Sequence, residues 1–339
     1  MYRRVTLKDL ACELGVSTTL VSRVLNAPRR ADGTPDCDIA PETARRVLET
    51  AKRLDYRPSR FASGLRSGRR FLLGVITPDI SNYAFAEAGR VIEELAHSDG
   101  YSVMFGSSTE NAGRMNELLE VFIDHGVDGI IVTPCAGCRE SLEKATAKGI
   151  PVVLINRDIP DLKGVGRVFQ DNRLSMKMVV DHFYSNGYRK IDMISERMDV
   201  NSLRDRESSY VQTMESYGLE PHILMVDSDK QEEQIRQHVK DAVKRGTEAL
   251  MAPRIRLSLY ALQSIMEMGL RIPQDMALFC HDDSAAFTTH CPTISYVSQS
   301  SDKLGTQAYL VLRDMIAGKG PRKEIIAPEL FYGGSSAAR

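Results

Sequence analysis

Polar and basic side chains near the start of the chain have the chemistry needed to bind a nucleic acid. Hydroxyl, guanidinium and amide groups recur there at helical spacing, at Thr6, Ser17, Thr18, Thr19, Ser22, Arg23 and Asn26. An arginine can pair with the acceptor edge of guanine, and hydroxyl and methyl groups suit mixed base edges. A serine that caps a helix leaves backbone N–H groups near the helix N-terminus, where a phosphate can bind. Thr18, Thr19, Ser22 and Arg23 are expected on the polar side of one helix. The set therefore predicts contacts with DNA bases and phosphates.

The apolar residues around this polar set predict the helices that position it. Residues 6–9 form a capping-box pattern, in which a hydroxyl is followed three residues later by an acid, and an apolar stripe at helical spacing overlaps it. Gly15 suits the positive φ of a tight turn, and residues 18–25 and 41–54 have the pattern of further helices. We expect a helix-turn-helix domain over residues 1–58. The alternative is an ordinary pair of helices in a helical domain.

The charges are distributed unevenly along the chain. The 339 residues include 44 Lys and Arg against 45 Asp and Glu, which gives a formal net charge of −1. Residues 1–70 hold 15 basic and 8 acidic side chains, a charge of +7, so the remainder carries −8. A basic segment of this kind favours a phosphate-binding surface, although a basic face that is merely solvated fits the charge equally well.

From residue 71 onward the pattern changes to alternating strands and helices. Buried-strand patterns begin at residues 71–77 and alternate with helical segments to residue 156, and a second series runs from about residue 172 to residue 280. This alternation predicts an α/β fold with parallel sheets covered by helices on both faces. Two such halves predict a clamshell with a ligand cleft. We expect one half from residues 71–168 and 298–326, and the other from 169–297 and 327–339.

The cleft of a two-lobed α/β protein is lined by loops that follow the carboxyl ends of its strands. The loop side chains suited to bind a small molecule are Asn82, Tyr83, Phe85, Arg157, Ser202, Arg206, Arg254 and Asp282. An arginine together with a carboxylate can bind adjacent sugar hydroxyls, and an aromatic ring can stack on a sugar. Three arginines favour a carboxylate or phosphate on the ligand, so an acidic sugar or a sugar phosphate is a further expectation. For each residue the alternative is a helix-end or surface ion pair.

Other functional classes have little support in the sequence. It contains no Gly-x-Gly-x-x-Gly between a strand and a helix, no Walker lysine loop and no Gly-x-Ser-x-Gly elbow. The seven histidines form no spaced metal pair, and Cys135 and Cys138 have metal or redox spacing without a second ligand pair, so we expect free thiols. We therefore expect no enzyme activity, cofactor or metal. The absence of an export signal or membrane span predicts a cytoplasmic, nucleoid-associated protein with no membrane partner.

Residues 16–26, VSTTLVSRVLN, resemble the recognition-helix signature of the lac-repressor and purine-repressor family of bacterial transcription regulators. The resemblance continues through LDYRP at 54–58, DISN at 79–82, GVDGII at 126–131, IPVV at 150–153, GLRIP at 269–273 and DD at 282–283. It covers nearly the whole chain. The family implies a DNA-binding headpiece, a hinge helix, and a core that is similar in architecture to periplasmic sugar-binding proteins.

The resemblance also implies roles for individual residues of the headpiece and hinge. The positions that read bases are Thr18, Thr19 and Arg23, and those that hold the DNA backbone are Ser17, Ser22 and Asn26. Residues 59–70 are expected to form a hinge helix or a linker. Residues 59–67 match the hinge helix of the family, which orders on operator DNA, and Leu65 matches the leucine that enters the minor groove. The alternative for Leu65 is a contact on the underside of the core. Further DNA contacts are expected from Arg57, Arg60 and Arg66.

The same resemblance implies how the core is used. Arg206 and Asp282 match two polar anchors of effector pockets in the family, whereas Arg254 replaces a common neutral hydrogen-bonding residue. We expect a homodimer that binds a near-palindromic double-stranded operator under the control of a small sugar-like effector. The expected function is regulation, and in particular repression, of a carbohydrate-utilisation operon. A solute-binding or sugar-processing α/β protein without a DNA role is the alternative, and it would leave residues 1–58 unexplained.

Three departures from the family pattern fall within the first 70 residues. The loop over residues 27–38 is longer than usual, and Arg29 and Arg30 within it are candidates for phosphate contact. Ala40 stands where a serine helix cap is common. Gly64 lies within the hinge segment, where glycine costs roughly 1 kcal/mol relative to alanine, so we expect a hinge whose helix depends strongly on DNA.

Overall fold

A computed structural model of the protein describes residues 5–28, 30, 34–56 and 69–339. The chain divides into two compact units, residues 1–70 (the headpiece) and residues 71–339 (the core). Each unit has hydrophobic clusters of its own. The predictions that concern Arg29, Arg57, Arg60, Gly64, Leu65, Arg66 and the hinge helix at 59–67 lie outside the described residues.

Three helices form the headpiece, and their bounds are Leu7–Leu14 (α1), Thr18–Asn26 (α2) and Pro41–Arg53 (α3). The predicted capping box is present, because Thr6 Oγ1 accepts a hydrogen bond from the Asp9 backbone at 3.3 Å and Asp9 accepts one from the Thr6 backbone at 2.8 Å. Gly15 ends α1 with a φ of +66°, a conformation that favours glycine. The predicted helix-turn-helix is confirmed.

Apolar side chains from all three helices close a small core in the headpiece. Leu10, Val21 and Val47 are each at most 1% exposed. Full burial of one such side chain stabilises the fold by about 1.5–3 kcal/mol. Ala40 precedes α3 without a side-chain cap, and in the long loop before it Arg30 forms an ion pair with Asp36 at 2.7 Å.

The first half of the core, which we call the N-lobe, is a six-stranded sheet in the order β11-β5-β4-β3-β1-β2, with parallel pairs throughout. Its strands are Leu72–Thr77 (β1), Ser102–Ser107 (β2), Gly129–Val132 (β3), Val152–Ile155 (β4), Val165–Gln170 (β5) and Lys323–Ile326 (β11). Tyr83–Ser98 (α5) and Ser301–Ile316 (α13) cover one face, and Ala112–His125 (α6) and Arg139–Ala147 (α7) cover the other. Gly74 lets the Phe122 ring approach β1, because an added Cβ would lie 2.2 Å from that ring.

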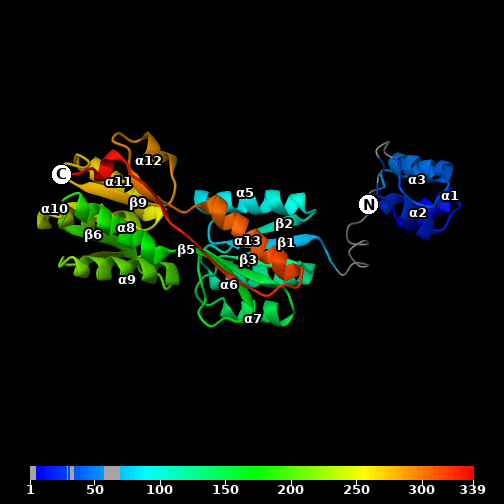
Figure 1. Cartoon of the computed structure of the whole chain (residues 1–339), viewed down its shortest axis with the longest axis horizontal. Helices are drawn as coiled ribbons and strands as arrows, with labels where there is room; N and C mark the ends of the chain where they lie inside the picture. Colours follow the sequence, from blue (N-terminus) through cyan, green and yellow to red (C-terminus); the bar gives the residue numbers. More distant parts are fainter. Residues whose placement is uncertain (1–4, 29, 31–33, 57–68) are drawn as a thin grey trace. The chain divides into compact units, whose positions relative to one another are not determined.

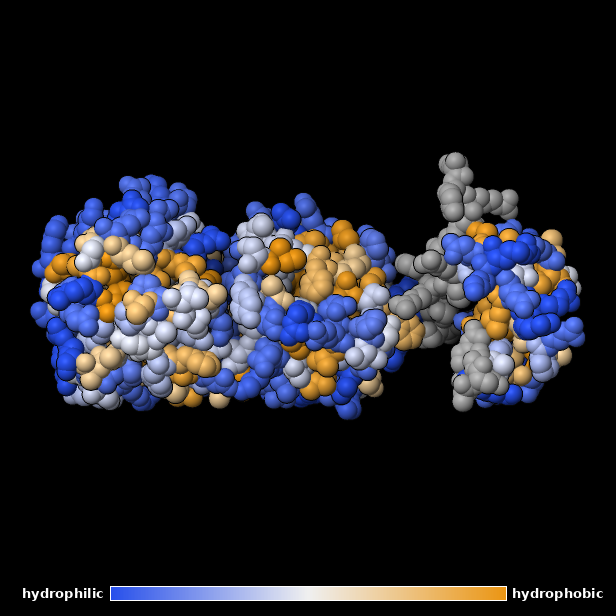
Figure 2. Space-filling view, turned by 90° about the horizontal axis from the view of Figure 1, so that it is seen from above, coloured by the Kyte–Doolittle hydropathy of each residue, from blue (hydrophilic) through white to orange (hydrophobic). Residues whose placement is uncertain are grey.

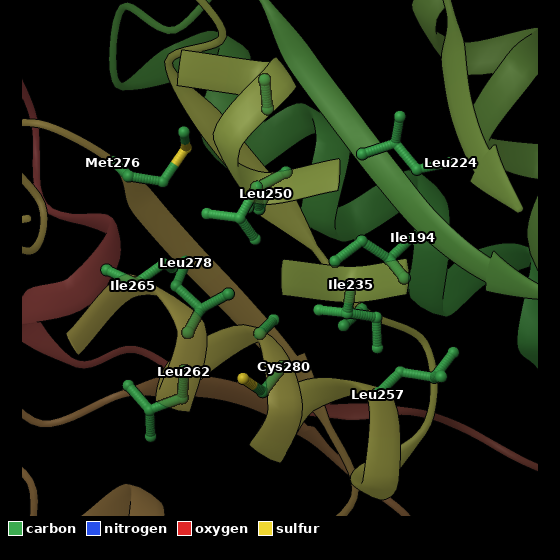
Figure 3. Close-up of a cluster of buried hydrophobic side chains, with 14 of the residues drawn as sticks. Ile194, Leu224, Ile235, Leu250, Leu257, Leu262, Ile265, Met276, Leu278 and Cys280 are labelled. Carbon is green, nitrogen blue, oxygen red and sulfur yellow. The ribbon is translucent and has the colours of Figure 1, made fainter. Parts of the chain in front are cut away.

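The second half, the C-lobe, has a six-stranded sheet in the order β12-β10-β9-β8-β6-β7, in which β12 runs antiparallel to β10. Its strands are Ile191–Glu196 (β6), His222–Val226 (β7), Ala249–Met251 (β8), Ala277–His281 (β9), Ser295–Ser298 (β10) and Glu329–Phe331 (β12). Its helices are Asn172–Ser185 (α8), Asn201–Ser216 (α9), Gln231–Arg245 (α10), Ile255–Glu267 (α11) and Ala285–Thr289 (α12), and a 3-10 turn spans Gly334–Ser336 (η1). Figure 3 shows Leu278 of the sheet beside Ile265 of α11, and Ile194 of the sheet beside Ile235 of α10, in one of its cores.

The chain passes between the lobes after β5, after β10 and after β11 (Figure 1). A hydrogen bond joins two of these connecting segments, because Gln170 Nε2 at the end of β5 donates to the Ser298 carbonyl at the end of β10, at 2.6 Å. In each sheet the strand order reverses beside the first strand, β1 or β6, and ligands bind at the carboxyl ends of strands at such points. The predicted α/β architecture is confirmed, although the sequence pattern did not predict β5, β10, β11 or α12.

Candidate functional site

The exposed face of α2 carries the polar side chains expected to read DNA. Thr18 and Thr19 are exposed, and the Arg23 side chain is 59% exposed with Asp38 4.0 Å away. Ser17 caps the helix, because its hydroxyl accepts a hydrogen bond from the Leu20 backbone at 3.2 Å. The helix therefore presents a guanidinium and two hydroxyls to solvent, next to backbone N–H groups at its first turn.

Ser22 is buried, unlike the other polar residues of α2 that are expected to contact DNA. The sequence pattern placed it on the polar side of α2, and that expectation is wrong, because Ser22 is only 5% exposed. It lies beside the apolar stripe of Val21 and Val24, and Asn26 Nδ2 donates to its carbonyl at 2.8 Å and to its hydroxyl at 3.2 Å. A contact of Ser22 or Asn26 with the DNA backbone stays a prediction.

A cavity of about 990 Å³ opens between the two lobes of the core. Its lining comes from the segments that follow the carboxyl ends of strands in both sheets. All of the predicted cleft residues line it, namely Asn82, Tyr83, Phe85, Arg157, Ser202, Arg206, Arg254 and Asp282. Asn82 also caps α5, where its side chain accepts a hydrogen bond from the Ala84 backbone at 3.0 Å, and the Tyr83 ring beside it is 60% exposed.

Arg157 lies at the N-lobe side of the cavity and is paired with a residue that the sequence did not indicate. Its Nη1 and Nη2 atoms each donate to one oxygen of Glu110 at 2.7 Å, and Nη1 also donates to the Pro134 carbonyl at 3.2 Å. Arg157 is only 5% exposed. Burial opposes the charge of Glu110, yet the Arg157 guanidinium holds the pKa of this carboxyl below its usual range.

Glu110 lies in a loop with an unusual backbone. Thr109 and Glu110 have φ values of +51° and +58°, and each such residue costs of order 1–2 kcal/mol relative to ordinary backbone. The bidentate pair with Arg157 offsets this cost. The only sequence signal was the position of Glu110, three residues past the end of β2.

Arg254 lies on the C-lobe side and bonds carboxylates of both lobes. Its Nη1 atom donates to Glu196 of the C-lobe, and its Nη2 atom lies 3.7 Å from Glu110 of the N-lobe. Glu196 is held in turn by the Ser228 hydroxyl at 2.6 Å and by Gln231 Nε2 at 2.7 Å. The three predicted arginines do share one cleft, but Arg157 and Arg254 already have carboxylate partners.

Arg206 is a buried arginine in the lining of the cavity. It is 4% exposed, its Nε atom donates to Asn172 Oδ1 at 2.8 Å, and its Nη1 atom donates to the Pro253 carbonyl. Burial lowers the pKa of Arg206 to about 10, so it stays charged at neutral pH. Within residues 69–339 no carboxylate lies within 4 Å of this guanidinium, which leaves its charge available to a ligand.

Asp282 follows β9 and has a φ of +72°. Its carboxylate attracts the Arg206 guanidinium electrostatically. His281 Nδ1 contacts its Oδ1 atom at 2.6 Å, Gln299 Nε2 donates to the same oxygen, and the Ile255 backbone N–H donates to Oδ2 at 3.2 Å. Burial opposes the charge of Asp282, but these contacts and the Arg206 charge hold its pKa below the usual range. The carboxylate is therefore charged and fixed in place.

His281 supports this carboxylate from inside the C-lobe. It is 0% exposed, and burial together with the Arg206 charge lowers its pKa to about 4. A neutral ring at pH 7 has one N–H, so Nδ1 donates to Asp282. Its Nε2 atom has no hydrogen-bond partner in the described part of the chain.

The described residues contain neither a metal-binding group nor a membrane-spanning helix. Among them, no group of three or more His, Cys, Asp and Glu side chains is placed to bind a metal ion, and the thiols of Cys135 and Cys138 are free and buried. None of the described helices is long and apolar enough to cross a membrane.

Comparison with protein families agrees with this geometry. Residues 6–59 match the model for bacterial regulatory proteins of the lacI family, and residues 180–336 match that of a periplasmic binding protein-like domain. The HTH-type transcriptional regulator KdgR of Bacillus subtilis is 30% identical over 326 residues, which cover 94% of each chain. The HTH-type transcriptional repressor PurR of Pasteurella multocida is 28% identical over 345 residues, which cover 98% of this chain and 99% of the relative.

Solved structures have the same fold. The crystal structure of the lac repressor dimer bound to operator and the anti-inducer ONPF matches with a TM-score of 0.84 at 20% identity, covering 99% of this chain and 100% of that one. A periplasmic binding protein/LacI transcriptional regulator from Alkaliphilus metalliredigens, complexed with D-xylulofuranose, matches with a TM-score of 0.68 at 22% identity, covering 78% and 98%.

A helix-turn-helix headpiece and a two-lobed core of the periplasmic-binding-protein kind together define a DNA-binding transcription regulator. The chain belongs to the lacI family of bacterial regulatory proteins. Its relatives are transcriptional regulators and not enzymes, and regulators of this family bind operator DNA and small-molecule effectors.

Proposed function

We propose that this regulator represses a carbohydrate-utilisation operon and that a small sugar-like effector in the interlobe cleft sets its affinity for the operator. The observation that carries the proposal is the pair of fixed opposite charges in one cavity, Arg206 and Asp282. A guanidinium and a carboxylate that are already oriented bind sugar hydroxyls without further ordering. Relatives named catabolite control protein A and a solved relative complexed with D-xylulofuranose support a sugar.

On the DNA side, we propose that Thr18, Thr19 and Arg23 read bases in the major groove. In this proposal the DNA backbone is held by Thr6, Ser17, Ser22, Asn26, Arg57, Arg60 and Arg66, and Leu65 enters the minor groove. Of these residues, Arg57, Arg60, Leu65 and Arg66 lie outside the described part of the chain. The charge of +7 on residues 1–70 supports phosphate binding. The acidic core, at −8, is expected to be repelled by DNA.

We also propose that the protein acts as a homodimer on a near-palindromic operator. Figure 2 views the core from the side on which α5 and α12 lie in Figure 1, and hydrophobic residues gather on this face of both lobes. Large apolar side chains are exposed around α5 and α11, with Ile80 at 57%, Phe105 at 42% and Met266 at 57%. Exposed apolar patches of this kind mark association surfaces. Two headpieces then read two half-sites.

The experiment is operator selection followed by ligand response. Full-length protein selects binding sites from random double-stranded DNA, and affinity for the selected site is measured with D-galactose, D-glucose, D-galacturonate and D-glucuronate. We expect a near-palindromic site and a sugar that changes the affinity about 5–150-fold, the range of typical allosteric coupling. Arg206→Ala and Asp282→Asn should bind the operator but lose the response, whereas Arg271→Ala, an exposed change outside the cavity, should keep it.

Two outcomes would contradict the proposal. A protein that binds a sugar in the cleft but selects no DNA would favour a solute-binding or sugar-processing role. A protein whose operator affinity responds to a sugar equally in the wild type, Arg206→Ala and Asp282→Asn would place the effector site elsewhere.

A further inference from the structure

We propose that Arg157 and Arg254 form a carboxylate subsite of the cleft and that Glu110 occupies this subsite until the carboxylate of a ligand replaces it. The subsite assigns a chemical class to the ligand, an organic acid such as a sugar acid. The identification of that ligand as the effector rests on the function proposed above. The binding of a carboxylate to the subsite does not depend on that function.

The geometry of the subsite is that of a bound carboxylate. Two parallel bonds of 2.7 Å join Arg157 to the two oxygens of Glu110, and Arg254 lies 3.7 Å from one of these oxygens. A planar guanidinium fork recognises a planar carboxylate in this way. An exogenous carboxylate placed on the same two arginines would make the same bonds.

Both arginines are held by other groups, so they would keep their places when Glu110 leaves. The Pro134 carbonyl accepts a bond from Arg157 at 3.2 Å. Glu196 and the sulfur of Met198 contact Arg254 Nη1, with the sulfur at 3.6 Å. The subsite is therefore built by the fold and does not depend on the Glu110 loop.

Glu110 is able to leave because of where its loop lies. Its side chain is 27% exposed and lines the cavity, so that the carboxylate is accessible from the cleft. The positive φ values of Thr109 and Glu110 mean that the loop is held in an unfavourable conformation, which release would relieve. Arg157, in contrast, is 5% exposed, and a ligand carboxylate would replace the charge compensation that Glu110 gives to this buried guanidinium.

The balance of charge favours a carboxylate over a phosphate. The described lining of the cavity contains four arginines and five carboxylates, Glu110 included. Exchange of Glu110 for one ligand carboxylate leaves this balance unchanged. A phosphate brings a charge of about −1.5 to −2 and would add negative charge to a lining that already has an excess.

Chemical rescue tests the subsite without DNA and without knowledge of the effector. Glu110→Ala removes the internal carboxylate, and sodium formate is the probe, compared with sodium chloride at equal ionic strength in thermal unfolding of the full-length protein. We expect formate to raise the Tm of the variant by about 2–4 °C, the shift expected at several times the Kd, and to leave the wild type unchanged. Glu110→Ser keeps a small polar side chain and provides the same comparison if the alanine variant does not fold.

Two controls make the result specific. Asp158→Ala removes the carboxylate partner of Arg167, a guanidinium that is 19% exposed and lies outside the cavity lining, while its bonds to the Val165 and Leu162 carbonyls remain. Formate should have no effect on that variant, and addition of Arg254→Gln to Glu110→Ala should at least halve the shift.

Three outcomes would overturn the inference. These are no formate-specific shift in either Glu110 variant, an equal shift in Asp158→Ala, or a larger shift with methyl phosphate than with formate, which would assign a phosphate subsite instead. Because no DNA is present, failure of operator binding would bear on the proposed function alone.

Discussion

Acidification from pH 7 to pH 5 should destabilise the core through His281. The pKa of this ring is lowered by burial from 6.5 to about 4, so the folded protein keeps it neutral across this interval while the unfolded chain takes up a proton. Stability is lost as the pH falls when the unfolded state binds more protons. For these two pKa values, the loss between pH 7 and pH 5 is about 2 kcal/mol.

Other groups in the core also contribute to the pH dependence of stability, and a variant of His281 separates its contribution from theirs. The pKa of Asp282 is lowered, so its contribution to stability is lost only below about pH 4, outside the interval. The pKa of His182 is lowered by burial as well, and its contribution has the same sign as that of His281. A comparison between the wild type and a His281 variant removes the contribution of His182.

The assay is urea unfolding followed by far-UV circular dichroism at pH 7 and pH 5, since the chain has no tryptophan. His281→Gln should be less stable than the wild type at pH 7, because it loses the ring that supports Asp282, but its pH-dependent loss should be smaller by about 2 kcal/mol. His97→Gln, a change at an exposed histidine, should keep the wild-type loss. An equal pH dependence in His281→Gln and the wild type would refute the reasoning.

Further predictions concern the headpiece and the sheet. Arg23→Ala should lose about 1–3 kcal/mol of operator binding and relax specificity at one base pair, whereas uniform weakening across all sequences would show that Arg23 contacts phosphate only. Leu10→Ala, at a position that is 0% exposed, should cost the headpiece about 2–5 kcal/mol in thermal unfolding, and a cost below 1 kcal/mol would contradict the described core. Gly74→Ala should destabilise the core by about 1–3 kcal/mol because its Cβ would meet the Phe122 ring, and unchanged unfolding of that variant would count against this packing.

The helices and buried strands were largely predictable because their signals are local. The capping box at Thr6, the turn at Gly15 and the apolar stripes define the headpiece from neighbouring residues alone. β10 and β11 were missed because each has only four residues, and β11 is a sheet edge with exposed Ile325, so no continuous apolar run marks it. β5 has six residues and was missed because Gly166 and Arg167 interrupt its apolar run. β10 pairs with β12, and β5 and β11 pair with each other, so these strands depend on partners that are distant in the sequence.

The candidate site divides in the same way. Asn82, Arg157 and Asp282 follow recognisable strands, and position alone placed them in the cleft. Glu110 was missed because its partner, Arg157, is 47 residues away in the sequence. Its loop also adopts a left-handed backbone conformation at residues other than glycine, so no glycine marks this conformation in the sequence. Ser22 was misplaced because its residue type suggested an exposed side chain, while its neighbours pack it into the headpiece.

The most direct test of ligand-controlled operator binding is one pair of affinities, measured in a single buffer. Full-length protein is titrated onto its selected operator with and without the sugar that gives the largest thermal shift. We predict a change of about 5–150-fold, together with an equal change in the affinity for that sugar when operator is present, because coupling is reciprocal. An operator affinity that is unchanged by a sugar bound in the cleft would contradict the coupling between core and headpiece on which the proposed function depends.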